Sequence, residues 1–204
     1  MAVDLDDTAL VRWRASPIAF IEEMLHDPET GRPFVLLEAE RAFMRHAFTL
    51  DCTGRLAYPE LVYGAIKKSG KTTCAALIVL VMVLLLSDGR FAEGYCIAND
   101  LEQAQSRVFL VVRRIVEASP LLRHGAKLTA DRITFPALDA SITAIASDAA
   151  SAAGGNPTIS CFDELWGYTS ERSRRLWDEM IRVGQSTVLD PGSWLRRGVC
   201  IATF

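Results

Sequence analysis

A segment near residue 70 has the residue types and spacing of a phosphate-binding loop. Residues 65–72, Ala-Ile-Lys-Lys-Ser-Gly-Lys-Thr, match G-x-x-x-x-G-K-[ST] except at the first position, where alanine replaces glycine. In that pattern the second glycine lets the backbone close around phosphate, the lysine reaches the β- and γ-phosphates, and the hydroxyl ligates Mg²⁺. We therefore predict a nucleotide-binding site in which Lys71 binds phosphate and Thr72 holds the metal; Lys67 either stabilises phosphate as well or lies in solvent. The predicted nucleotide-binding residues of the loop are Ala65, Ile66, Lys67, Lys68, Ser69, Gly70, Lys71, Thr72 and Thr73.

Two adjacent acids follow a second apolar segment. Asp163 and Glu164 come directly after Ile-Ser-Cys-Phe at residues 159–162. At the end of a strand, Asp163 can hold Mg²⁺ and Glu164 can polarise the water that attacks the γ-phosphate. An isolated acidic pair of this kind more often begins a solvated helix. Downstream of a phosphate loop, with a strand, a helix and a hairpin between them, the catalytic interpretation is favoured.

A hydroxyl residue, Thr203, ends a third apolar segment at residues 199–202. Beside a phosphate site, such a side chain can hydrogen-bond the γ-phosphate or the attacking water and report hydrolysis to the next segment. The structural alternative is a β-branched residue that closes a strand. The segment by itself leaves the two interpretations equal.

The remaining pattern predicts the elements that position these residues. Short apolar or alternating segments indicate strands, and apolar residues at helical spacing indicate helices. Strands that alternate with helices predict an α/β fold with a mostly parallel sheet covered on both faces. We expect strands at 61–66, 94–98, 158–162 and 198–202, a hairpin within 128–146, and helices at 17–25, 37–48, 71–86, 101–118 and 171–182.

Composition limits the class of protein. The chain has 204 residues and a formal net charge of −3, which argues against a protein whose main task is to coat nucleic acid. Five cysteines without a C-x-x-C pair predict free thiols and a cytoplasmic location. The acidic N-terminus disfavours a signal peptide, and the apolar run at 74–86 is too short to span a bilayer. The three histidines lack metal-ligand spacing; they are His26, His46 and His124.

Over nearly its whole length the sequence resembles the ATPase domain of the large subunit of tailed-phage terminases, the motors that package DNA into proheads. The phosphate loop at 67–72 is similar to the family's degenerate loop, which commonly lacks the first glycine. The most specific stretch runs from residues 147–149 through Gly-Asn-Pro at 155–157 to Asp-Glu-Leu-Trp at 163–166. Ala-Thr at 202–203 resembles the coupling motif.

The resemblance implies a three-layer P-loop fold of the RecA-like type, with Mg²⁺ and ATP as ligands. It divides the chain into an N-terminal helical segment on the adenine side, 1–50, and a P-loop core, 51–204, and it implies no nuclease activity for this length of chain. Double-stranded DNA, a portal protein and a small terminase subunit are the implied partners of a homo-oligomeric ring. Glu40 stands where the family often places an adenine-reading glutamine, and a carboxylate there can accept from the adenine amino group but cannot donate.

In such rings an arginine from one subunit completes the neighbour's site. The candidates are Arg107, Arg113, Arg114 and Arg132. DNA would be held through its phosphates, with Arg172, Arg174, Arg175, Arg196 and Arg197 as possible contributors. A superfamily-2 helicase has a similar acidic box, and a non-catalytic nucleotide-dependent assembly module remains a further alternative.

Overall fold

The computed structural model describes most of the chain. The described residues are 7–52, 54, 56–66, 68–87, 91–98, 107–146, 157–163, 169–171, 174–178 and 199–203. Lys67 and Glu164 of the predicted site therefore lie outside the described residues, as do Arg172, Arg196 and Arg197 of the possible DNA contacts.

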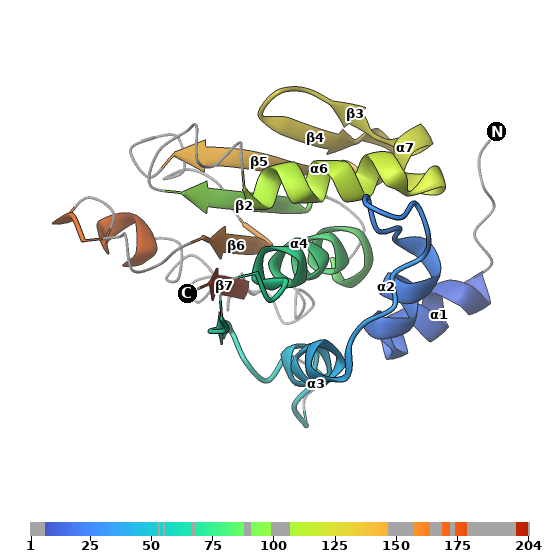
Figure 1. Ribbon diagram of the computed structural model, residues 1–204, viewed down its shortest axis with the longest axis horizontal. Helices are drawn as coiled ribbons and strands as arrows, with labels where there is room; N and C mark the ends of the chain where they lie inside the picture. The colour runs from blue at the N-terminus through green and yellow to red at the C-terminus, as the bar shows by residue number, and fades with distance from the viewer. Residues whose placement is uncertain are drawn as a thin grey trace.

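The described strands form one seven-stranded sheet in the order β1-β7-β6-β2-β5-β4-β3 (Figure 1). The first five strands in that order are parallel, and β4 and β3 extend the sheet in antiparallel fashion. This confirms the predicted α/β class and the predicted hairpin. The strands are β1 (Glu60–Tyr63), β2 (Glu93–Ala98), β3 (Lys127–Leu128), β4 (Arg132–Phe135), β5 (Ala140–Ala146), β6 (Ile159–Phe162) and β7 (Val199–Thr203).

Strand order in space differs from strand order in the chain. β7, the last strand in sequence, lies between β1 and β6, whereas β2 and β5 lie beyond β6. Parallel neighbours cannot be joined by a tight turn and need crossover connections, so sequence order does not dictate position in the sheet. As a result the strand before the phosphate loop and the strand before the acidic pair are separated by one strand, β7.

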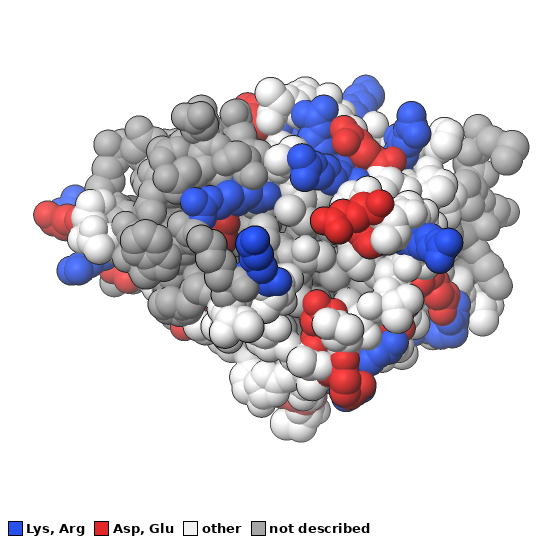
Figure 2. Space-filling view, in the orientation of Figure 1, with Lys and Arg blue, Asp and Glu red and all other residues white. Residues whose placement is uncertain are grey.

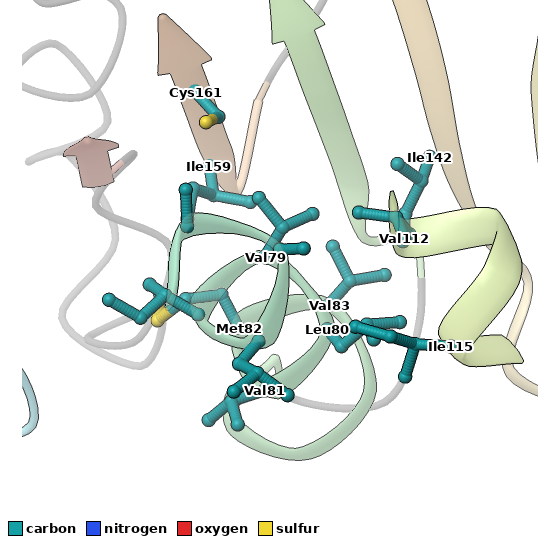
Figure 3. Close-up of a cluster of buried hydrophobic side chains, with 14 of the residues drawn as sticks. Val79, Leu80, Val81, Met82, Val83, Val112, Ile115, Ile142, Ile159 and Cys161 are labelled. Carbon is teal, nitrogen blue, oxygen red and sulfur yellow. The ribbon is translucent and has the colours of Figure 1, made fainter. Parts of the chain in front are cut away.

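One face of the sheet is covered by α4 (Lys71–Val81), its π-helical continuation η1 (Met82–Leu86) and α6 (Val108–Ala118). Every residue of 74–83 is buried, which explains the long apolar run in the sequence. A helix that is apolar on all sides needs neighbours on all sides, and α4 packs against α6, α2, β6 and β7. In Figure 3 its side chains gather between Ile159 of β6 and Ile115 of α6.

The other face of the sheet is also covered. Side chains alternate along a strand, so Ile97 and Phe162 point away from the face that α4 covers. These two residues are register partners and are both buried. Trp177, in the helical residues 174–178, contacts Phe162 with ring centroids 4.8 Å apart. The sheet is therefore the middle layer of three, as predicted.

Three helices precede the sheet: α1 (Asp7–Ala15), α2 (Pro17–Met24) and α3 (Glu38–Ala47). The sequence pattern did not predict α1. A 2.5 Å ion pair between Arg12 and Glu23 holds it to α2, together with a 2.9 Å hydrogen bond that Trp13 Nε1 donates to the same carboxylate. The Trp13 ring also packs edge-on against Phe20, with centroids 5.7 Å apart.

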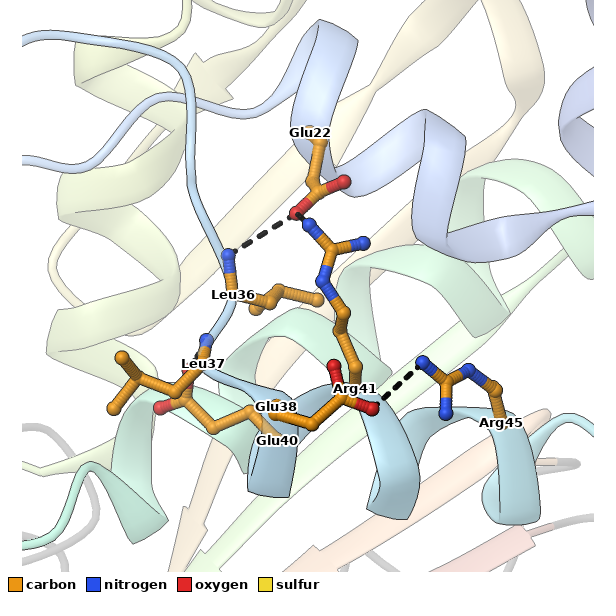
Figure 4. Close-up of polar contacts among 7 residues, drawn as sticks. All are labelled: Glu22, Leu36, Leu37, Glu38, Glu40, Arg41 and Arg45. Carbon is orange, nitrogen blue, oxygen red and sulfur yellow. Dashed lines mark hydrogen bonds and ion pairs between the residues drawn. The ribbon is translucent and has the colours of Figure 1, made fainter.

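A half-buried carboxylate joins α2 to α3 (Figure 4). Glu22 Oε1 pairs with the guanidinium of Arg41 and accepts a 3.1 Å hydrogen bond from the backbone N–H of Leu36. A second pair, between Arg45 and Glu38, lies along α3 itself and is exposed. The Glu22 contacts fix the start of α3, which faces the phosphate loop.

Some predicted boundaries need correction. The first strand ends at Tyr63 and not at residue 66, because the chain turns there into the phosphate loop. The helix predicted from residue 101 is described from Val108, and residues 101–106 lie outside the described part. A short helix, α7 (Pro120–Gly125), was missed although Ser-Pro at 119–120 is a common helix start. Among the described residues no helix has the length and apolarity needed to span a membrane.

Candidate functional site

The loop between β1 and α4 has the backbone shape of an anion cradle. Gly70, at the N-cap of α4, has φ +79°, and Lys68 has φ +67°. Left-handed residues two apart turn successive N–H groups towards one point, which is the geometry of phosphate-binding nests. A lysine in this region is strained, and such strain is concentrated at functional sites. The start of α4 adds the positive end of a helix dipole.

Lys71 lies across the mouth of this loop. Its Nζ donates to the backbone oxygen of Ala65 at 2.5 Å and to that of Ile66 at 2.9 Å. An ammonium group has three donors, so one remains for an anion. The missing first glycine of the motif does not disturb this arrangement, because residue 65 contributes its carbonyl and not its side chain.

The hydroxyls around the loop fit an incoming phosphate and metal. Ser69 Oγ is buried and has no hydrogen-bond partner among the described residues. A buried polar atom without a partner is costly, so Ser69 Oγ is a candidate to bind a ligand oxygen. Thr72 and Thr73, in the first turn of α4, are half-buried. The residues present therefore fit a nucleotide with its metal.

Asp163 lies at the carboxyl end of β6. Its backbone N–H donates to the oxygen of Ile97 at 3.1 Å, which continues the sheet for one residue beyond the strand. Asp163 is buried, with only 6% of its surface exposed. Strand alternation puts it on the same face as Ile159 and Cys161, the face that α4 covers. Asp163 thus follows the end of a strand that α4 covers, and Thr72 lies in the first turn of α4.

Burial and the charge of Asp163 affect a neighbouring thiol. The pKa of Cys96 is raised to about 12, chiefly by burial and further by the Asp163 carboxylate. Cys96 and Cys161 are register partners on neighbouring strands, and neither forms a disulfide. Cys74 is also buried and free, whereas Cys52 is exposed, and the side chain of Cys200 lies outside the description.

The sheet register brings the three sequence motifs to one edge. Tyr63, the last residue of β1, pairs with Thr203, the last residue of β7. Ala202 pairs with Phe162, so Thr203 is level with Asp163. Because β1, β7 and β6 are parallel, their carboxyl ends meet at the same edge. The register therefore brings three parts of the chain together that are far apart in sequence. They are the start of the phosphate loop after β1, Thr203 at the end of β7, and Asp163 after β6.

Glu40 reaches the phosphate loop from α3. Its Oε2 accepts a 2.8 Å hydrogen bond from the backbone N–H of Leu37, and its Oε1 lies close to Gly70, where an added Cβ would be 3.1 Å from it. The carboxylate also affects two groups behind the loop. Burial, and then the Glu40 charge, raise the pKa of Cys74 to about 12. The pKa of Tyr63 is raised as well, first by burial and then by Cys74 and Glu40.

A pocket of about 730 Å³ continues outward from the loop. Gly70 and Thr73 line its inner end, the segment at 27–37 forms one wall, and α6 forms the other. Its volume is within the usual range of small-molecule sites, about 300–1,000 Å³. Motif analysis missed this site because its walls are separated by some 80 residues in the chain. No local sequence pattern marks the pocket, and the exposure of Val35 and Leu37 in its wall is known only from the structure.

The candidate arginines fall in different places. Arg113 pairs with Glu117 at 2.9 Å in its own helix, and Arg114 lines the pocket of its own chain. Arg132 donates to Ser141 Oγ at 3.0 Å in the hairpin, and Arg107 precedes α6. Of the possible DNA contacts, Arg174 is exposed and Arg175 pairs with Glu171 at 2.7 Å.

Among the described residues, no group of three or more His, Cys, Asp or Glu could hold a metal ion. Figure 2 shows Lys and Arg interspersed with Asp and Glu over the described part of this face.

Comparison with known proteins gives the family. The model for "Terminase large subunit, ATPase domain" matches residues 51–193. The crystal structure of the HK97 bacteriophage large terminase is similar to this chain with a TM-score of 0.71 at 17% identity, over 93% of this chain and 37% of that chain. The Thermus phage P74-26 large terminase ATPase domain gives a TM-score of 0.49 at 15% identity, over 83% and 64%. No curated protein matches the sequence. This chain spans just over a third of the HK97 protein. Because the family model matches most of this chain, the chain belongs to the terminase large subunit ATPase domain family.

Proposed function

We propose that this chain binds and hydrolyses MgATP on the loop at 65–73 and that hydrolysis drives the translocation of double-stranded DNA. The observation that carries the proposal is the convergence of the cradle-shaped loop, Asp163 and Thr203 at one edge of the sheet. Family membership supports nucleotide binding and ATPase activity. It also favours a packaging motor over the superfamily-2 helicase alternative.

The phosphate-binding roles follow from the loop. Lys71, with one donor left, contacts the β- and γ-phosphates, and Lys67 and Lys68 add charge beside it. Backbone N–H groups of residues 65–73 surround the phosphate chain. Thr72 and Asp163 would hold Mg²⁺, Thr72 through its hydroxyl and Asp163 through the ion's water shell. When bound, the metal neutralises charge on the phosphate oxygens.

The catalytic roles fall on Glu164, two residues beyond β6, and on Thr203, the last residue of β7. Glu164 polarises the attacking water as general base, which typically contributes about 10²–10⁴ in rate. Thr203 hydrogen-bonds the γ-phosphate or that water and passes the change to the segment that follows. Its level position beside Asp163 supports this assignment.

The assembly is part of the same proposal. A ring of copies of this chain would grip the DNA phosphate backbone without reading its sequence, alongside a portal protein and a small terminase subunit. Arg107, Arg113, Arg114 and Arg132 remain the candidates for the arginine that completes a neighbour's site; within the chain, Arg113 pairs with Glu117 and Arg132 donates to Ser141. The proposed division into segments 1–50 and 51–204 assigns Glu40 to the adenine side.

Two variants test the chemistry. We expect Lys71→Ala to weaken binding of a non-hydrolysable ATP analogue at least tenfold. Glu164→Gln should keep that binding and lower steady-state ATP hydrolysis at least 100-fold. Lys127→Ala and Glu171→Gln, exposed residues outside the phosphate loop and the pocket lining, are the matched controls and should retain wild-type values.

Three results would contradict the proposal. Unchanged analogue affinity in Lys71→Ala would refute the phosphate loop. Wild-type hydrolysis in Glu164→Gln would refute the role of that glutamate. A wild-type chain that binds the analogue and never hydrolyses ATP, with or without DNA, would favour a non-catalytic assembly module.

A further inference from the structure

One side of α3 contacts both ends of the phosphate loop. Glu40 Oε1 lies against Gly70, the residue between the loop and α4, where an added Cβ would be 3.1 Å from it. Three residues further along α3, Phe43 packs against Tyr63, the last residue of β1 before the loop, with ring centroids 4.4 Å apart. Residues three apart lie on the same side of a helix. Neighbouring side chains of one helix therefore hold the loop where it begins and where it ends.

Tyr63 also contacts α4. Its hydroxyl donates a hydrogen bond to the thiol of Cys74, which is only 1% exposed. The backbone N–H of Cys74 in turn donates to the oxygen of Gly70 at 2.9 Å, which closes the first turn of α4. The phenol thus ties the end of β1 to the start of α4, across the base of the phosphate loop.

Lys71 crosses between the same two parts of the chain. It lies in the same turn of α4 as Cys74, and its Nζ donates to the backbone oxygens of Ala65 and Ile66 at the start of the loop. A shift of the end of β1 relative to α4 would therefore change the shape of the loop and the position of the Lys71 ammonium. A displacement of about 1 Å near a reacting group can lower an enzymatic rate about 100-fold.

From these contacts we propose that Tyr63 is a positioning residue of the phosphate loop, which fixes the loop against α4 through Cys74 and against α3 through Phe43. This role rests on the proposed function for the reaction that takes place at the loop. It gives the N-terminal helices a second part in that reaction, because α3 supports the loop from behind in addition to the adenine side assigned to Glu40.

The hydrogen bond to α4 is tested with a double-mutant cycle. Binding of a non-hydrolysable ATP analogue with Mg²⁺ and steady-state ATP hydrolysis are measured for wild type, Tyr63→Phe, Cys74→Ala and the double variant. We expect each single change to weaken the analogue about threefold and to lower kcat about tenfold, because the loop is no longer fixed against α4. The double variant should match the single variants, since all three lack the same hydrogen bond. Cys74→Ser, whose hydroxyl can accept from Tyr63, should recover most of the loss.

Tyr95→Phe is the matched control. The Tyr95 hydroxyl donates to Glu93 Oε2 at 2.9 Å within β2. Gly94 faces Val83 of η1, so alternation along the strand places Tyr95 on the opposite face of the sheet. Removing this hydroxyl should leave analogue affinity and kcat at wild-type values. The unfolding free energy of every variant is measured alongside, so that only folded chains are compared.

The ring contact with α3 gives a second measurement. Phe43→Leu removes the ring that packs on Tyr63, and we expect kcat to fall about fivefold. Phe48→Leu is the control, because Phe48 is also half-buried and directly follows α3. An equal loss of kcat in Phe48→Leu would show that the Phe43–Tyr63 contact has no special part in the reaction.

Several results would overturn the role of Tyr63. A loss of unfolding free energy in Tyr63→Phe without a change in affinity or kcat would make the contact purely structural. Additive losses in the double variant, or equal losses in Tyr95→Phe, would show that Tyr63 does not act through Cys74. If Lys71→Ala loses analogue binding while Tyr63→Phe behaves as wild type, the phosphate loop stands and the role of Tyr63 fails. If wild type binds the analogue without hydrolysing ATP, the proposed hydrolysis fails and the affinity cycle decides the role of Tyr63.

Discussion

Glu40 lies directly against Gly70, so that a methyl group at Gly70 would come within 3.1 Å of Glu40 Oε1. The two residues are 30 positions apart, and their contact joins the N-terminal helices to the phosphate loop. It also means that Gly70 is required for two separate physical reasons, its φ of +79° and the lack of space beside it.

The first prediction separates the effect of the positive φ at Gly70 from the effect of the contact with Glu40. Gly31→Ala is a matched control, because Gly31 has φ +67° and open space around an added Cβ. We expect it to cost only the left-handed strain, about 1–2 kcal/mol of unfolding free energy. Gly70→Ala should cost more in urea denaturation and should also weaken nucleotide binding. In the Gly70→Ala background, Glu40→Ala should recover part of the loss, a coupling that a double-mutant cycle measures. Equal costs at both glycines would contradict the contact.

A second prediction concerns packing beneath α4. An added Cβ at Gly94 of β2 would lie 2.8 Å from Val83 Cγ2 and 3.3 Å from Ile142 Cγ1, both in the core. Overpacking of this kind typically costs about 1–3 kcal/mol, so Gly94→Ala should lower the denaturation midpoint accordingly. Gly64→Ala, where nothing lies within 4 Å and φ is not positive, should stay within about 0.5 kcal/mol of wild type. A neutral Gly94→Ala would show that η1 can move away.

The third prediction is the effect of removing one side of the α2–α3 link. Arg41→Ala leaves the half-buried Glu22 with a single backbone donor, and we expect a loss of about 1–2 kcal/mol in chemical denaturation. The exposed Arg45–Glu38 pair offers the control, since such pairs contribute about 0–1 kcal/mol. If Arg45→Ala proved as costly as Arg41→Ala, burial would not be the deciding factor.

The fourth prediction is a loss of stability at alkaline pH. Burial raises the pKa of Cys74, Cys96 and Tyr95 to about 12 each. An acid whose pKa is higher in the folded chain contributes stability that is complete below its unfolded pKa and is lost as pH rises towards the folded value. The unfolding free energy should therefore fall from about pH 9 towards pH 12.

Urea titrations between pH 8 and pH 11 measure that slope. Cys96→Ala should make it shallower, whereas Cys52→Ala, at an exposed thiol, should leave it unchanged. Alkylation at pH 8 should correspondingly label Cys52 before Cys74 and Cys96. Rapid labelling of Cys96 in the folded chain would contradict its burial.

Local pattern was sufficient for the motifs and for most elements. The spacing of Gly70, Lys71 and Thr72 between a short apolar segment and a long apolar helix predicted the loop, and the structure gives it a left-handed glycine at the start of α4. The alternation within 128–146 predicted the hairpin. The loop and the hairpin depend on residues that are close together in the chain, so a sequence pattern can predict them. Boundaries were less certain, as β1 shows, because a turn can end a strand before its apolar residues do.

The local pattern of the chain predicted which residues could carry the chemistry: a phosphate loop, an acidic strand end and a hydroxyl at a third strand end. The position of β7 between β1 and β6, which makes Thr203 level with Asp163, is visible in the fold alone. The fold also decides that Glu40 touches Gly70 and that Arg114 faces the same pocket. The physical reason is that crossover connections and core packing set these contacts between distant residues, and no local period encodes them.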